Sequence, residues 1–97
     1  MLQFVDLKQE TPVKRSTNKR KDDFNEIYNE FITERAKDQS SRCSQCGVPF
    51  CQIHCPLSNN IPDWLKLTAE GRLKEAYELS QSTNNMPEVC GRICPQD

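Results

Sequence analysis

Apolar side chains recur with helical spacing between Asp22 and Lys37. The stripe consists of Phe24, Ile27, Tyr28, Phe31 and Ile32. Intervals of three and four residues place these side chains on one face of an α-helix. Acidic residues at the start of the segment and basic residues near its end suit the helix dipole. The pattern predicts a helix over residues 22–37 whose aromatic side chains lie in the core.

Two shorter stripes follow in the second half of the chain. The first predicts a helix over residues 61–70, which Gly71 can end in a left-handed cap. The second predicts a helix over residues 72–81, and one further turn is expected over 87–94. The sequence has no alternation of apolar and polar residues typical of a β-strand. We therefore expect an all-α fold of three to four short helices around cysteine-rich loops.

The remaining segments are polar. Residues 1–21 have no helical period, and their basic group consists of Lys14, Arg15, Lys19, Arg20 and Lys21. We expect an extended or mobile arm here, or alternatively an arm that docks on an acidic surface. Residues 38–42 form a polar break before the first cysteine. The helical domain is expected to span residues 22–97.

Composition restricts the class of protein. The 97 residues allow one small domain, and only 35% of them are hydrophobic. The mean hydropathy of −0.80 indicates a thin core, and such domains often depend on metals, disulfides or partners. The sequence contains no apolar run suited to a signal peptide or a membrane span. We expect a cytoplasmic protein with neither a membrane nor a nucleic-acid partner.

The candidate chemistry lies in six cysteines. They are Cys43, Cys46, Cys51, Cys55, Cys90 and Cys94. The first four follow the pattern C-x2-C-x4-C-x3-C-P, and the last two end in a second Cys-Pro pair. Thiolates this close in sequence can converge on one point, as a metal site requires. We interpret the histidine between them, His54, as a surface residue or a hydrogen-bond donor to a metal-bound sulfur.

Three interpretations of the cysteines compete. A disulfide framework requires an oxidising compartment, and the chain has no export signal. A zinc site would fold the loop, with His54 as an alternative ligand. Phe50 and Trp64 could then stack on single-stranded nucleic acid, so a zinc-stabilised interaction or nucleic-acid-binding module is the alternative function. Zinc gives no role to Cys90 and Cys94, however, and does not explain the prolines.

Iron–sulfur ligation accounts for both features. In two-cluster ferredoxin-type sequences, three close cysteines hold one cluster and a fourth, followed by proline, reaches the other. Here Cys43, Cys46 and Cys51 would hold the first cluster. Cys55 and Cys94 would serve the second or help to close the first. The middle spacing of four residues differs from the usual two.

A longer stretch carries a specific resemblance. Residues 42–64, R-C-S-Q-C-G-V-P-F-C-Q-I-H-C-P-L-S-N-N-I-P-D-W, resemble the N-terminal iron–sulfur domain of the small (beta) subunit of NADPH-dependent glutamate synthase. The agreement continues through residues 71–79 and 83–95. The domain type is also similar to the N-terminal part of dihydropyrimidine dehydrogenase.

This resemblance implies an α-helical ferredoxin-like domain with two 4Fe–4S clusters, followed in the same chain by FAD- and NADPH-binding domains. Electrons would pass from NADPH through FAD and the clusters to the large subunit, which makes glutamate from glutamine and 2-oxoglutarate. By resemblance, Cys43, Cys46 and Cys51 match ligands of the first cluster. Cys55 and Cys94 match ligands of the second, and the role of Cys90 is left open.

The family pattern continues beyond Pro95 with two further cysteines, whereas this sequence ends at Asp97. Two 4Fe–4S clusters need more ligands than six cysteines supply. The resemblance therefore implies a truncated domain with an incomplete ligand set. We expect this piece alone to lack catalytic activity, with no catalytic acid, base or nucleophile.

Overall fold

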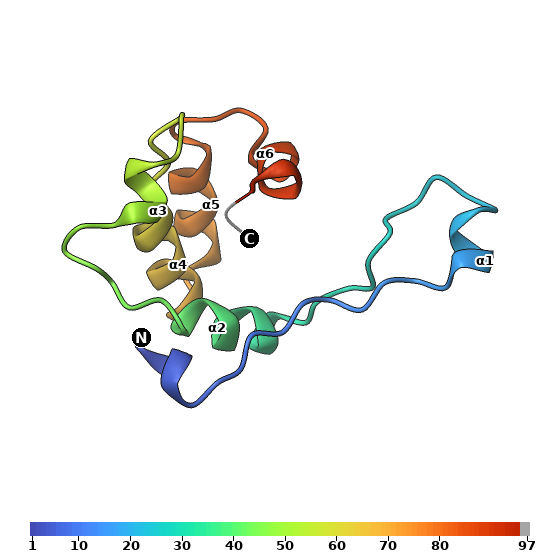
Figure 1. The fold of residues 1–97 in the computed structure, drawn as a ribbon, viewed down its shortest axis with the longest axis horizontal. Helices are drawn as coiled ribbons and strands as arrows, with labels where there is room; N and C mark the ends of the chain where they lie inside the picture. The colour runs from blue at the N-terminus through green and yellow to red at the C-terminus, as the bar shows by residue number, and fades with distance from the viewer. Residues whose placement is uncertain (96–97) are drawn as a thin grey trace.

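The computed structural model describes residues 1–95 as a helical body from which a long arm projects (Figure 1). Its elements are η1 (Gln3–Val5), α1 (Thr17–Arg20), α2 (Thr33–Ser41), α3 (Phe50–Ile53), α4 (Ile61–Ala69), α5 (Leu73–Gln81) and α6 (Pro87–Ile93). Among these residues there is no β-strand, and the predicted all-α class is confirmed. None of the helices in the described range has the length and apolar character needed to cross a membrane.

The body is built on α4, which packs against α2 on one side and α5 on another (Figure 1). One small residue on each helix is buried: Ser40, Pro62 and Ala76. Small side chains at these positions allow the helices to approach closely. The core is thin, as the composition predicts, because most large apolar side chains remain partly exposed.

The predicted helices of the second half are confirmed to within one residue at most ends. Pro62 lies in the first turn of α4, where its missing N–H costs no hydrogen bond. Gly71 ends this helix with a φ of +80°, which glycine adopts without strain. Lys37 of α2 lies so close that its Nζ is 3.0 Å from the position of a Cβ at residue 71. Glycine here therefore serves both the turn and the packing of α2.

The helix predicted over residues 22–37 is wrong for residues 22–32 and confirmed for residues 33–37. Most of this segment is extended, and α2 begins only at Thr33. It then continues to Ser41, through the polar break predicted at residues 38–42. Phe24, predicted to lie in the core, is fully exposed.

Backbone pairing explains this difference. The N–H of Arg15 donates to the carbonyl of Ile27 at 2.8 Å, and the N–H of Asn29 donates to the carbonyl of Val13 at 2.8 Å. These bonds flank an isolated bridge between residues 14 and 28. The segment is rich in aromatic, β-branched and asparagine residues, which favour helix weakly. The helical spacing of the apolar residues was therefore outweighed by pairing with a distant segment.

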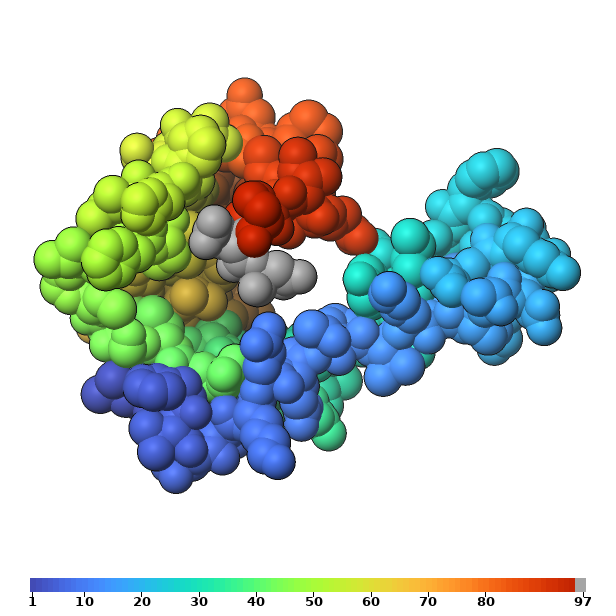
Figure 2. All heavy atoms as spheres, in the orientation of Figure 1, coloured from blue at the N-terminus to red at the C-terminus, as the bar shows by residue number. Residues whose placement is uncertain are grey.

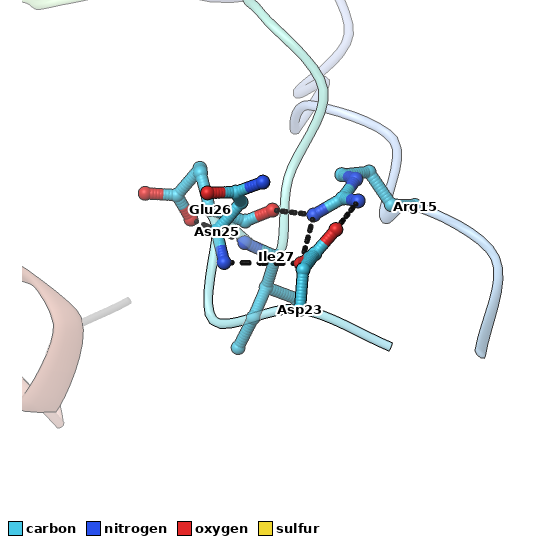
Figure 3. A network of polar contacts seen from close by, with 5 residues as sticks. All are labelled: Arg15, Asp23, Asn25, Glu26 and Ile27. Atoms are coloured by element: carbon cyan, nitrogen blue, oxygen red, sulfur yellow. Dashed lines mark hydrogen bonds and ion pairs between the residues drawn. The ribbon is translucent and has the colours of Figure 1, made fainter. Parts of the chain in front are cut away.

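A polar network lies beside this bridge (Figure 3). The guanidinium of Arg15 donates to both carboxylate oxygens of Asp23, at 2.6 and 3.1 Å, and to the carbonyl of Glu26 at 3.0 Å. Asp23 also accepts the N–H of Asn25 at 3.0 Å, and the Glu26 carboxylate accepts the N–H of Ile27 at 2.9 Å. The Arg15 hydrogen bond and then the Asn25 N–H lower the pKa of Asp23 to about 2.

The division of the chain into an arm, residues 1–21, and an iron–sulfur domain, residues 22–97, stays a prediction. Asp97, where the cysteine pattern is expected to be cut off, lies outside the described residues.

Candidate metal centre

The cysteine loop begins where α2 ends. The N–H of Cys43 donates to the carbonyl of Ser40 at 3.2 Å, and its carbonyl accepts the N–H of Leu2 at 2.9 Å. Beside it, the Nε of Arg42 donates to the carbonyl of Leu7 at 2.9 Å. The half-buried Cys43 is thus held between the end of a helix and the N-terminal segment.

Gln45 connects this cysteine to α4. Its side-chain Nε2 donates to the carbonyl of Pro62 at 2.7 Å and to the Sγ of Cys43 at 3.3 Å. The backbone φ of Gln45 is +52°, which turns the loop sharply before the exposed Cys46. Sequence reasoning missed Gln45, because a glutamine between two cysteines belongs to no recognised motif.

The cysteine loop contains one helical turn, α3, which carries the exposed Cys51. The rings of Phe50 and His54 stack at its two ends, with centroids 6.0 Å apart and planes 8° from parallel. Both rings are exposed to solvent. This pairing gives His54 a structural contact on the surface.

Cys55 follows α3 and is half-buried. Backbone N–H groups point at its sulfur: that of Asn59 has the largest effect, followed by those of Leu57 and Ser58. Together they lower the pKa of the Cys55 thiol below its ordinary value, because hydrogen bonds to the thiolate favour the charged form. The thiolate is the form that binds metals.

The side chain of Asn59 anchors this turn to the body. Its Nδ2 donates to the carbonyl of Ser80 at 2.8 Å and to the Oγ1 of Thr83 at 3.1 Å. Its Oδ1 accepts the indole N–H of Trp64 at 2.8 Å. These long-range contacts carry no sequence signal.

The last two cysteines belong to α6, where the predicted further turn is confirmed. Cys90 is half-buried on this helix, and the exposed Cys94 directly follows its last residue. Between them, Arg92 donates to the carboxylate of Glu26, in the segment between α1 and α2, with Nη1 at 3.1 Å from Oε1. This ion pair joins two segments 66 residues apart.

The donor chemistry of these residues fits an iron–sulfur cluster. All six cysteines are free thiols, and thiolates are the usual ligands of such clusters. The cysteine side chains are spread apart. Within residues 1–95, no three potential ligands lie close enough together to hold a metal ion. The loop residues 44–49 between α2 and α3 lie on the surface of the body (Figure 2).

Residues 20–97 match the family described as dihydropyrimidine dehydrogenase domain II, 4Fe-4S cluster. The chain belongs to this family. The match to the 4Fe–4S domain includes every cysteine, and it confirms the recognition based on the cysteine pattern.

Individual relatives agree with this assignment. The chain is 69% identical over its full length to the glutamate synthase [NADPH] small chain of Azospirillum brasilense, and covers 20% of that relative. It is 54% identical over 98% of its length to the small chain of the same name from Escherichia coli, again covering 20%. A putative oxidoreductase of Escherichia coli, AegA, is 45% identical over 89% of the chain, which covers 13% of AegA. The chain spans about a fifth of the length of the small chains that it matches.

Proposed function

We propose that this chain is the electron-transfer 4Fe–4S domain of the small subunit of an NADPH-dependent glutamate synthase. The observation that carries the proposal is the run of four cysteines, closed by proline, in a chain of the 4Fe–4S family. In the complete subunit, the domain relays electrons from NADPH and FAD to the large subunit. The large subunit uses them to form glutamate from glutamine and 2-oxoglutarate.

Within this proposal, the cysteines divide between two clusters. Cys43, Cys46 and Cys51 would hold the first cluster, and Cys55 and Cys94 would contribute to the second. When bound, the clusters supply one-electron redox chemistry. The protein contributes ligation and hydrogen bonds to sulfur, so no acid, base or nucleophile is required.

Two hydrogen-bonded anchors support the view that the body positions these ligands. Gln45 attaches the first cysteine turn to the carbonyl of Pro62, and Asn59 attaches the turn after Cys55 to Trp64. Both attachment points lie in the first half of α4. Both cysteine turns are therefore attached to the same helix, in addition to their contacts with other parts of the chain.

The ligand assignment can be tested by substitution in the full-length small subunit, purified without oxygen and combined with the large subunit. We expect Cys55→Ser to lose one cluster, measured as iron and sulfide content, together with NADPH-dependent glutamate synthesis. Reduction of ferricyanide by NADPH, which needs only the FAD domain, should continue. Val48→Ala, an exposed change in the same loop, is the control and should keep both clusters. Full cluster content in Cys55→Ser would contradict the assignment.

A further inference from the structure

The arm, defined here as residues 8–32, stands apart from the helical body. It extends sideways from α2 and carries α1 at its far end (Figures 1 and 2). None of its residues is buried, and its projection helps to give the described chain a longest dimension of 46 Å. A two-stranded hairpin without a core is marginally stable in water by itself. The arm therefore needs contacts other than a core to keep its extended shape.

Polar contacts hold the arm in this extended shape. The bidentate contact of Arg15 with Asp23 closes its outer part, and Glu26 is joined to Arg92 of α6. The arm is therefore fixed at its outer part and connected to the helix that precedes Cys94. An element held in this way can present its surface without first being ordered, which lowers the entropic cost of binding.

The surface that the arm presents is apolar in part. Phe24 is fully exposed, and Val13 and Ile32 are more than half exposed. A cleft of about 550 Å³ lies at the base of the arm, with Pro12 and Phe31 among its lining residues. The apolar residues at the base line one cleft, Val13, Phe31 and Ile32, whereas Phe24 stands alone on the outer part of the arm.

The outer part of the arm is also basic. Lys19, Arg20 and Lys21 lie together in and just after α1, and Lys14 lies on the facing segment. Within the described residues, none of these four takes part in a salt bridge. A cluster of positive charge at the outer end of the arm complements an acidic surface on a partner, although Asp22 and Asp23 separate it from Phe24 in the sequence.

We propose that the arm is the docking element by which this domain binds the large subunit of glutamate synthase, with Phe24 entering an apolar pocket on an acidic face of that subunit. The inference rests on the proposed function, and the relatives' designation as small chains implies a larger partner. Aromatic side chains are enriched at protein interfaces, where a few of them carry most of the binding energy. Single-stranded nucleic acid is less favoured, because its binding uses several aromatic platforms in succession.

The docking role can be tested with the full-length, cluster-containing small subunit and the purified large subunit. The dissociation constant is measured by biolayer interferometry at low and at physiological salt. We expect Phe24→Ala to weaken association about 10- to 30-fold, as for an interface anchor. The double variant Lys19→Glu/Lys21→Glu should weaken it by a similar factor at low salt and by less at higher salt, because salt screens exposed charges.

Matched controls lie on the body. Tyr77→Ala removes another exposed aromatic side chain, and Lys66→Glu/Lys74→Glu reverses two exposed charges. Both should bind like the wild type. Unchanged association of the arm variants would overturn the docking proposal and leave the proposed function intact. Binding of an oligonucleotide that is lost in the charge-reversed arm variant, with association to the large subunit unchanged, would also overturn it.

Two readouts separate this proposal from the proposed function. The arm variants should retain wild-type iron and sulfide content and normal reduction of ferricyanide by NADPH. If the wild-type small subunit fails to bind the large subunit and to support glutamate synthesis, the proposed function itself fails. If the wild type succeeds and the arm variants match it, only the docking inference fails.

Discussion

The helical body and the arm are stabilised by different means. The body packs α2, α4 and α5 around small buried residues and uses Gly71 and Pro62 at its turns. The arm buries no side chain and depends on backbone pairing and on the Arg15–Asp23 contact. The cysteine turns are therefore hydrogen-bonded to a packed body, whereas the arm has no such support and is held by polar contacts that pH and salt can weaken.

The largest contrast should come from removing one aromatic side chain from each region. We expect Trp64→Ala to destabilise the body by about 2 to 3 kcal/mol, because it removes packing on α4 and a hydrogen bond to Asn59. Phe24→Ala should change stability by less than about 0.5 kcal/mol, because the ring is fully exposed. The change in the free energy of unfolding of the body is measured for both variants by hydrogen exchange of the α4 amides in the full-length subunit. Similar effects of the two variants would contradict the comparison.

A smaller effect is expected at the anchor of the Cys55 turn. Asn59→Ala leaves the Trp64 indole and the Ser80 carbonyl without their partner, at a cost of about 2 kcal/mol. Exchange should accelerate in residues 56–60 and at the end of α5, while the arm stays unchanged. Asn60→Ala is a neighbouring control that removes only the contact with Gln52. Equal exchange in both variants would argue against an anchoring role.

Gly71→Ala tests the turn between α4 and α5. An alanine at a φ of +80° is strained, and its Cβ would displace the end of the Lys37 side chain. We expect a loss of about 1 to 2 kcal/mol. Gly91→Ala is the control, because a Cβ there meets no atom within 4 Å and helix propensity favours alanine. The stability of the body, measured by hydrogen exchange, should fall in Gly71→Ala and not in Gly91→Ala.

The smallest expected effect concerns pH and the arm. An aspartate in an unfolded chain titrates near 3.9, whereas the contact with Arg15 lowers the pKa of Asp23 to about 2. Because the folded value is the lower one, this contact contributes fully above about pH 4 and is lost as the pH falls through about 2. The chemical shift of the Asn25 amide, followed by NMR, should change with a midpoint near pH 2. In the Asp23→Asn variant this pH-dependent change should disappear. A midpoint near pH 4, the ordinary value for an aspartate, would contradict the contact between Arg15 and Asp23.

Sequence reasoning was reliable where local signals and packing agree. In α4 and α5, apolar spacing, a first-turn proline and a terminal glycine all indicate the same helices. At residues 22–32 the same apolar spacing was misleading. The decisive backbone partners there, Val13 and Arg15, pair with Asn29 and Ile27, which lie 16 and 12 residues away, and leave no periodic trace.

The candidate site was predictable in its donors but not in its supports. The cysteines and their prolines form a pattern that can be recognised directly, and the 4Fe–4S family assignment agrees with it. Gln45 and Asn59 act through hydrogen bonds to residues 17 and 21 positions away. An amide side chain in a loop has many possible partners, so only the folded chain identifies the one it binds.

The central claim is that the cysteines of this chain bind iron–sulfur clusters. Its most direct test is the metal and sulfide content of the full-length small subunit, purified and reconstituted without oxygen. The account predicts iron and acid-labile sulfide in equal amounts, sufficient for two 4Fe–4S clusters, with broad visible absorption that bleaches on reduction. A colourless protein with stoichiometric zinc and no sulfide would contradict it.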